Sequence, residues 1–142
     1  PPLRYEVPLR LKQEHPELTV ILNGGLKTLS QIREWLPQFD GVMLGRQAYH
    51  EPYLLAELHQ AFVDAAWSLP SREMIVEQYA QYVERMLQEG NRLPLMLRHI
   101  HGLYTGFPGT RSWRRFLGEQ GTRAGAGADV LRQSLRVFDR AA

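Results

Sequence analysis

Short apolar runs alternate with amphipathic stretches along the amino-terminal third of the chain. Residues 5–14 have the pattern of a helix, whereas the mostly apolar runs 19–22 and 41–44 are typical of strands buried on both faces of a parallel sheet. Between these runs, residues 28–36 form an amphipathic helical stretch that opens with the threonine–glutamine spacing of a capping box. The order helix, strand, helix, strand is that of a βα-repeat fold.

Two strands of this kind need further strands beside them, because a two-stranded sheet is not stable by itself. We therefore expect residues 1–70 to be the last βα units of a larger barrel. The chain opens at Pro1 without an initiator Met or the features of a secretion signal, so we interpret it as a piece of a longer protein whose amino-terminal part is missing here. Residues 51–70 show no clear period, and we place the domain boundary at their end.

From Ser71 onward the pattern is helical. Ser71 is placed to cap a long helix that stops before Gly90, and Thr110 is placed to cap another. The further helices are expected over residues 94–104, 111–120 and 129–140. The apolar stripe of the first helix is expected to contain Ile75, Tyr79, Tyr82, Val83, Met86 and Leu87. Four helices with short connections predict a small bundle over residues 71–142.

The charge of the chain is unevenly distributed, although the net value is only +2. Residues 1–90 carry eight Lys or Arg against twelve acidic residues, whereas residues 91–142 carry nine Arg, no Lys and three acidic residues. A basic segment on an otherwise acidic chain favours a polyanionic partner, and the planar fork of Arg suits phosphate. A solvated helical face with no partner is the alternative.

The composition excludes several classes of protein. The chain has no cysteine, so a disulfide framework and a cysteine-ligated metal site are excluded, and a reducing, cytoplasmic location is expected. No apolar run approaches the roughly 20 residues that span a bilayer, so no membrane is expected as a partner. His99 and His101 would point apart in a helix, and we expect no metal site.

Each apolar run ends in a glycine-containing segment. Asn23, Gly24 and Gly25 follow the first run, and Gly45 and Arg46 follow the second about 20 residues later. In TIM barrels the loops after the last two strands often hold a phosphate group. Glycines let backbone N–H groups approach the phosphate, and an arginine offsets its charge with two hydrogen bonds. Tight turns that bind nothing are the alternative, but two such motifs at this spacing favour a phosphate site.

A second group of candidate residues belongs to the helix expected after Thr110. Arg111, Arg114 and Arg115 have the i, i+3, i+4 spacing that places side chains on one helical face, while Trp113 falls on the opposite, packed face. Arg98 extends the basic surface from the preceding helix. Such a surface would attract the phosphates of a nucleic acid over a long range. An exposed arginine-rich helix without a partner is the alternative.

Several segments, in order along nearly the whole chain, carry a resemblance to a known family. They are Pro1-Pro2-Leu3-Arg4-Tyr5, Leu22-Asn23-Gly24-Gly25, Asp40-Gly41-Val42-Met43-Leu44-Gly45-Arg46, Arg98-His99, Pro108-Gly109 and Trp113-Arg114-Arg115. Together they resemble the carboxy-terminal part of the A-type tRNA-dihydrouridine synthases. The resemblance implies an α/β and then all-α chain: the last βα units of an FMN-binding TIM barrel over residues 1–70, followed by a small helical tRNA-binding bundle over residues 71–142.

The resemblance also implies an activity. The family consists of FMN-dependent oxidoreductases that reduce uridine to dihydrouridine in the D-loop of tRNA, with NADPH as reductant. The residues that it implies as holders of the FMN phosphate are Asn23, Gly24, Gly25, Gly45 and Arg46. For tRNA it implies the helical domain, with Arg111 and Arg114 as the best candidates, and the basic surface adds Arg98 and Arg115 to the predicted tRNA-binding residues. The family's general acid is a cysteine on an earlier barrel loop. Because this chain contains no cysteine, we expect no catalytic residue in it and no activity from it alone.

Two alternative functions remain open. A non-catalytic RNA-binding helical module would bind RNA without any need for flavin. Another FMN-dependent TIM-barrel oxidoreductase, acting on a small molecule, would bind flavin but would give no reason for the nine arginines after residue 90.

Overall fold

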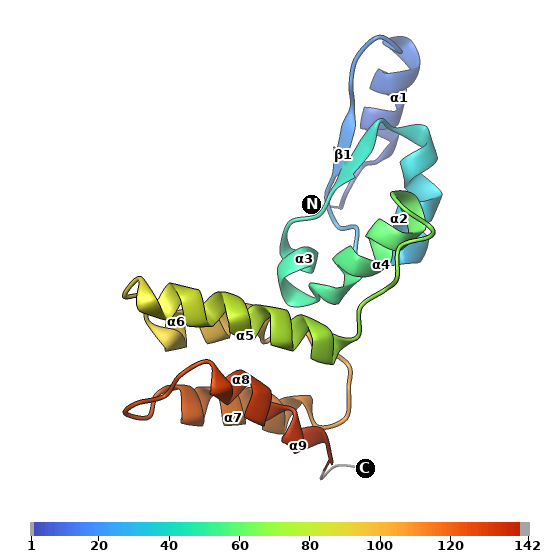
Figure 1. Cartoon of the computed structure of the whole chain (residues 1–142). Helices are drawn as coiled ribbons and strands as arrows, with labels where there is room; N and C mark the ends of the chain where they lie inside the picture. Colours follow the sequence, from blue (N-terminus) through green and yellow to red (C-terminus); the bar gives the residue numbers. More distant parts are fainter. Residues whose placement is uncertain (1, 140–142) are drawn as a thin grey trace.

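The computed structural model describes residues 2–139 and divides them between a mixed lobe and a purely helical lobe (Figure 1). The mixed lobe contains α1 (Glu6–Glu14), β1 (Ile21–Asn23), α2 (Leu29–Trp35), the 3₁₀ helix η1 (Leu36–Gln38), β2 (Gly41–Met43), α3 (Arg46–His50) and α4 (Tyr53–Phe62). The helical lobe contains α5 (Arg72–Gln88), α6 (Leu93–Leu97), the 3₁₀ helix η2 (Arg98–Ile100), α7 (Thr110–Gly121), α8 (Asp129–Ser134) and α9 (Arg136–Asp139).

β1 and β2 form a parallel pair, which confirms the two predicted strands. Ile21 lies opposite Gly41, and Asn23 lies opposite Met43. α2 connects the two strands and packs the buried side chain of Ile32 into the same small core as Leu22 of β1. Because the strands are parallel, their carboxyl ends lie at one edge of the sheet, and the segments that follow them meet there.

The helix starts at α2 and α5 were also predicted correctly, since both depend on local capping. The hydroxyl of Thr28 accepts a hydrogen bond from the backbone N–H of Gln31 at 3.2 Å, and that of Ser71 accepts one from Met74 at 3.2 Å. The capping box at α2 is not reciprocal, however. The Gln31 side chain accepts from the N–H of Lys27, one residue before the cap, at 2.9 Å.

Residues 51–70 contain a helix, α4, that the sequence did not reveal. Its first two residues, Tyr53 and Leu54, are buried, and Tyr53 joins the core of the helical lobe. Leu58, further along the same helix, packs against the core of the mixed lobe instead. The apolar residues of α4 therefore face two different cores and do not follow a single stripe, which explains the missing period.

The buried face of α5 differs from the predicted stripe. Its fully buried residues are Val76, Ala80 and Val83. Tyr82, which was expected in the stripe, is exposed, and Tyr79 lies at the margin of the core, where its hydroxyl donates to the Met96 carbonyl at 3.0 Å. A tyrosine hydroxyl needs a partner, so the ring stays beside the core and smaller side chains fill the centre.

Two predicted helices are divided, and one predicted cap is wrong. The helix expected over 94–104 consists of α6, η2 and a series of turns, and the one expected over 129–140 is split between α8 and α9, with residue 140 outside the described residues. The residue that precedes α7 is Gly109, with φ +84°. Thr110 is the first helical residue, and its hydroxyl donates to the Phe107 carbonyl at 2.7 Å instead of accepting from the helix.

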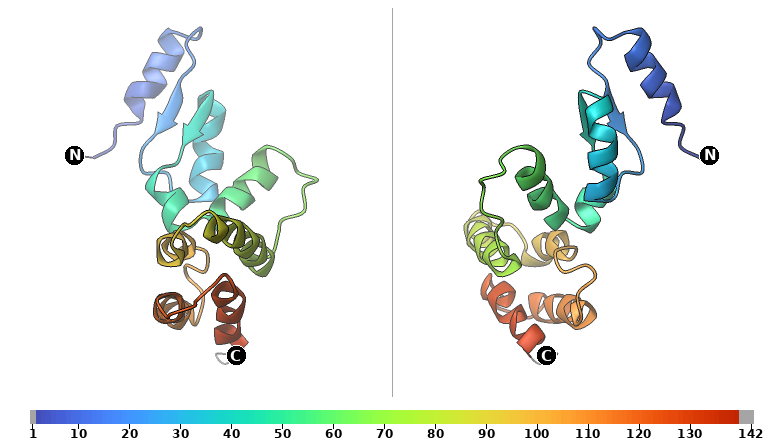
Figure 2. Two further views of the ribbon diagram at one scale, coloured as in Figure 1. Left: turned by 60° about the vertical axis from the view of Figure 1, so that its left-hand side comes forward. Right: turned by 90° about the vertical axis from the view of Figure 1, so that its right-hand side faces the viewer.

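α5 to α9 pack as a bundle. Figure 2 shows α5 and α6 side by side over α8 and α7, in agreement with the close approach of α5 to α8 and of α6 to α7. Trp113 of α7 lies at the centre with no exposed surface, as predicted, and its indole N–H donates to the hydroxyl of Ser134 at 2.8 Å. Within residues 2–139 no helix is long and apolar enough to cross a membrane.

Candidate functional site

A cleft of about 420 Å³ opens where β1 and β2 end. It is lined by Asn23, Gly24, Gly25, Leu26, Lys27, Met43, Gly45, Arg46, Gln47 and His50. The structure thus brings all five residues that were predicted to hold a phosphate group to a single place. The parallel register explains this convergence, because both glycine segments leave the sheet at the same edge.

The turn after β1 requires its glycines. Gly24 and Gly25 have φ values of +126° and +63°, which side chains rarely allow. A Cβ on Gly25 would overlap the side chain of Leu3 and would lie 3.2 Å from the hydroxyl oxygen of Tyr5. The Tyr5 hydroxyl also donates to the carbonyl of Gly24. The segment before α1 therefore packs against this turn and stabilises it.

The glycine after β2 is free of such packing. Gly45 has a negative φ of −97°, and a Cβ added there would meet no atom within 4 Å. Packing within the described residues therefore gives no reason for a glycine at this position. A ligand that approaches the backbone at the cleft would give one, since only glycine leaves that space open.

The charge of the cleft is positive. Its lining contains Arg46 and Lys27 and no carboxylate. Among the salt bridges of residues 2–139, none involves either of these two cations. Sequence reasoning missed Lys27, although it follows the glycine pair by two positions. It also missed His50, which the i, i+4 spacing places on the same helical face as Arg46.

The four predicted tRNA-binding arginines are all exposed, but those of α7 do not share one face. Arg114 turns toward residues 101–105, where its Nε donates to the His101 carbonyl at 2.8 Å and its Nη2 donates to the Thr105 hydroxyl at 3.0 Å. Arg115 turns the other way, and its Nε lies 3.9 Å from a carboxylate oxygen of Glu119. The positive surface of α7 is therefore broader than the single face that the spacing predicted.

Arg115 lines a second cleft, of about 460 Å³, between α7 and the last two helices. Its lining consists of Gly109, Ser112, Arg115, Phe116, Glu119, Gln133, Arg136 and Val137. Arg136 adds a second cation that was not singled out in the sequence, where only the overall excess of arginine pointed to it.

The two histidines of the helical lobe have separate environments. His99 Nδ1 lies 3.1 Å from the hydroxyl of Tyr49, in α3. His101 Nε2 is buried without a hydrogen-bond partner, and burial together with the charge of Arg114 lowers the pKa of its imidazole. Across residues 2–139, the side chains that could bind a metal ion do not gather in groups of three or more.

Comparison with known proteins identifies relatives of the whole described region. The family model described as "Dihydrouridine synthase (Dus)" matches residues 1–139. A protein of Pseudomonas aeruginosa named tRNA-dihydrouridine(20/20a) synthase is 46% identical over 141 residues, which cover 99% of this chain and 40% of the relative. Proteins of the same name from Shewanella oneidensis and Vibrio cholerae are 42% and 40% identical, over 93% and 95% of the chain and 39% and 41% of their own lengths. The chain spans about two fifths of these relatives.

Proposed function

The chain belongs to the dihydrouridine synthase family, and from this membership we propose that it works as part of a flavin-dependent tRNA-dihydrouridine synthase. The complete enzyme reduces uridine in the D-loop of tRNA to dihydrouridine, with FMN as cofactor and NADPH as reductant. A tRNA substrate places this activity in the cytoplasm. The observation that carries the proposal is the meeting of Asn23, Gly24 and Gly25 with Gly45 and Arg46 at one cationic cleft.

The cleft suits the phosphate end of FMN. In this proposal, backbone N–H groups of the two glycine segments donate to phosphate oxygens, and Arg46 offsets the charge of the dianion with two parallel hydrogen bonds; the lining of the cleft by all of these residues supports it. Lys27 adds a second positive charge. The open space at Gly45 lets the phosphate approach the backbone closely. Bound FMN supplies the hydride chemistry, and the role of these residues is to hold and orient it.

We further propose that β1 and β2 are the last strands of a TIM barrel, with the barrel portion over residues 1–70 and the helical tRNA-binding domain over residues 71–142. The exposed apolar side chains of the strand pair support this arrangement: Ile21 and Met43 each leave about half of their surface uncovered, as expected where other strands and helices pack in the complete protein. The family's general acid, a cysteine, then belongs to the remaining part of the enzyme, since this chain has none.

The basic surface of the helical lobe suits the tRNA backbone. Arg98, Arg111 and Arg115 are exposed, and the lobe (residues 71–142) has eleven basic and seven acidic residues, whereas residues 1–70 are net negative. Each guanidinium that neutralises a phosphate releases condensed counterions, so binding is expected to weaken steeply as salt rises. A small-molecule flavin oxidoreductase would not need this surface.

The decisive experiment measures FMN affinity in the full-length protein. Arg46→Ala should weaken FMN binding by about tenfold to hundredfold, because it removes a net interaction comparable to one charge-assisted hydrogen bond, about 1.5–3 kcal/mol. The matched control is Arg33→Ala, which removes the same charge from the exposed face of α2 and does not line the cleft. Unchanged FMN affinity in Arg46→Ala would refute the assignment. A full-length protein that binds tRNA but no flavin would favour the non-catalytic RNA-binding module instead.

A further inference from the structure

α3 lies between the strand pair and the helical bundle (Figure 1). Both of its ends line the cleft, through Arg46 and His50. The carbonyl group of His50 faces the other way and meets the turns that follow η2 in the helical lobe. A single short helix therefore touches both the candidate cofactor site and the domain that carries the basic surface.

The first contact is backbone against backbone. Gly102 is buried, and a Cβ added to it would lie 2.5 Å from the His50 carbonyl oxygen and 2.8 Å from the Pro52 side chain. Gly102 does not have a positive φ, so its backbone conformation does not require a glycine. The requirement comes from docking, because any side chain at this position would push the bundle away from the end of α3.

The second contact is a chain of hydrogen bonds. The Thr105 hydroxyl donates to the His50 carbonyl at 3.0 Å and accepts from Nη2 of Arg114 at 3.0 Å. The hydroxyl has one proton and accepts a hydrogen bond from the guanidinium with its oxygen, so its own proton is free to bond the His50 carbonyl. Nε of Arg114 is bound as well, to the carbonyl of His101 at 2.8 Å. α7 is thereby connected to α3 through one threonine.

A third contact lies beside this chain. The Tyr49 hydroxyl of α3 is 3.1 Å from His99 Nδ1, and the two rings meet edge to face with centroids 5.8 Å apart. The three contacts involve residues about 50 positions apart in the sequence and all involve the same end of α3. Their combination fixes both the distance and the rotation of the bundle relative to the cleft.

We propose that α3 is the docking element that sets the orientation of the helical bundle relative to the cleft, with Thr105 and Arg114 as positioning residues. The inference rests on the proposed function: if the bundle holds tRNA and the cleft holds FMN, their relative orientation decides whether the target uridine reaches the flavin. Arg114 already uses two of its five N–H groups on protein acceptors. Its main contribution is therefore to hold α7 in place, whereas exposed Arg111 contributes charge.

The test is Thr105→Val in the full-length holoenzyme, since this change keeps the shape and charge of the site and removes only the hydroxyl. We expect kcat for dihydrouridine formation to fall by about tenfold or more, because small misplacements of a substrate strongly reduce the rate. FMN affinity and the salt dependence of tRNA binding should not change. Thr105→Ser, which keeps the hydroxyl, should restore kcat.

The matched control is Thr122→Val at the end of α7, where the hydroxyl bonds only carbonyls of its own helix. It should leave kcat unchanged. A Thr105→Val enzyme with the parent kcat would overturn the inference. So would an equal loss in Thr105→Ser, because packing and not the hydroxyl would then be responsible.

A double-mutant cycle separates the docking inference from the proposed function, since it needs no activity. Thermal midpoints of Tyr49→Phe, His99→Ala and the double variant are compared in the full-length protein, because Tyr49 belongs to α3 and His99 to the helical lobe. Docking on α3 predicts that the double variant melts close to the lower of the two single variants, whereas the shifts of Thr122→Val and Tyr49→Phe should add. If the thermal midpoints are coupled but the parent protein forms no dihydrouridine, only the proposed function is refuted. Additive shifts would refute the docking.

Discussion

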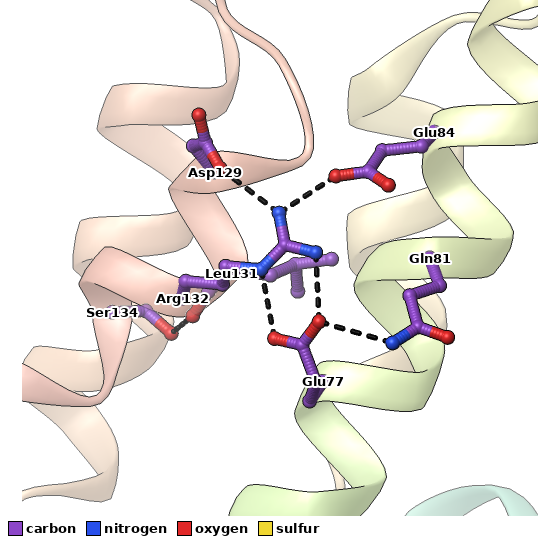
Figure 3. A network of polar contacts seen from close by, with 7 residues as sticks. All are labelled: Glu77, Gln81, Glu84, Asp129, Leu131, Arg132 and Ser134. Atoms are coloured by element: carbon purple, nitrogen blue, oxygen red, sulfur yellow. Dashed lines mark hydrogen bonds and ion pairs between the residues drawn. The ribbon is translucent and has the colours of Figure 1, made fainter.

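The guanidinium of Arg132 donates a hydrogen bond to each carboxylate oxygen of Glu77 (Figure 3). Nε lies 2.7 Å from Oε2, and Nη2 lies 2.8 Å from Oε1. Its Nη1 donates to Glu84 at 2.7 Å and to Asp129 at 2.9 Å. Gln81 donates to Glu77 as well, at 3.2 Å. The fork-to-fork geometry is the strongest that an arginine and a carboxylate form, and it joins α8 to α5 on the outside of the bundle.

This network predicts how the stability of the bundle depends on acid. The hydrogen bonds from Arg132 and then Gln81 lower the pKa of Glu77 to about 2. A carboxyl with a depressed pKa stabilises the fold above its unfolded value near 4.5, and this stabilisation is lost as pH falls from there to about 2. Glu77→Gln should therefore lower the urea midpoint at pH 7 and flatten its decline in that window. The matched control is Glu89→Gln, which removes an exposed carboxylate at the end of α5 that forms no salt bridge within residues 2–139. Parallel curves for the parent and Glu77→Gln would contradict the assignment.

The buried pair of Trp113 and Ser134 predicts two graded losses of stability. Trp113→Ala should cost about 3–5 kcal/mol, because it empties the centre of the bundle. Ser134→Ala should cost about 1–3 kcal/mol, because the indole N–H loses its acceptor in a buried place. Trp113→Phe lacks that N–H, so Ser134→Ala should cost less in its background. Chemical denaturation of the parent, Ser134→Ala, Trp113→Phe and the double variant measures this difference. Equal costs of Ser134→Ala in both backgrounds would exclude the hydrogen bond as the cause.

Two glycine substitutions separate folding from cofactor binding. Gly25→Ala should lower both the thermal midpoint and the FMN affinity, since φ is positive and the new methyl overlaps Leu3. The new methyl of Gly45→Ala meets no atom of the protein within 4 Å. The thermal midpoint of the flavin-free protein should therefore fall less than in Gly25→Ala. The FMN affinity of Gly45→Ala should nevertheless drop, because the methyl occupies the space that the phosphate needs. Parent-like FMN affinity in Gly45→Ala would show that the cofactor does not approach this backbone.

Salt titration of tRNA binding tests the basic surface. Arg111→Ala should weaken binding to different tRNAs alike and reduce the slope of log affinity against log salt by about one, as for the loss of one phosphate contact. Arg114→Ala should mainly lower the thermal midpoint, because it breaks two hydrogen bonds, and should reduce the salt slope less than Arg111→Ala does. Arg123→Ala, an exposed residue beyond α7, is the charge-matched comparison. If Arg111→Ala binds like the parent at every salt concentration, α7 does not contact the tRNA backbone.

Residues 1–142 should not catalyse the reaction alone. The sequence contains no cysteine for the general acid, and two strands do not enclose a flavin ring. Incubation with FMN, NADPH and unmodified tRNA should give no dihydrouridine, as detected by nucleoside analysis. Any turnover above a control without protein would show that the acid and the flavin site lie within this chain.

Features that depend on neighbouring residues were predictable from the sequence by itself. The caps at Thr28 and Ser71 follow from a side-chain oxygen that reaches an N–H three residues later. The strands β1 and β2 follow from apolar runs bounded by glycine. The cleft residues follow from one further rule, that parallel strands joined by a helix end at the same edge. The spacing of the two strands and this rule were therefore sufficient to predict that Arg46 lies beside the turn at Asn23.

Only the tertiary structure decided which surfaces those elements bury. α4 has no single stripe, because Tyr53 faces one core and Leu58 faces the other. Arg114 turns toward Thr105 and not toward the face expected from its spacing with Arg111, since its acceptors lie in a segment that docks on α3. A helical period indicates that one face of a helix is buried, but it does not indicate which other element packs against that face. Contacts between residues far apart in sequence arise only when the elements pack, and these contacts dock the turns of the helical lobe on the end of α3.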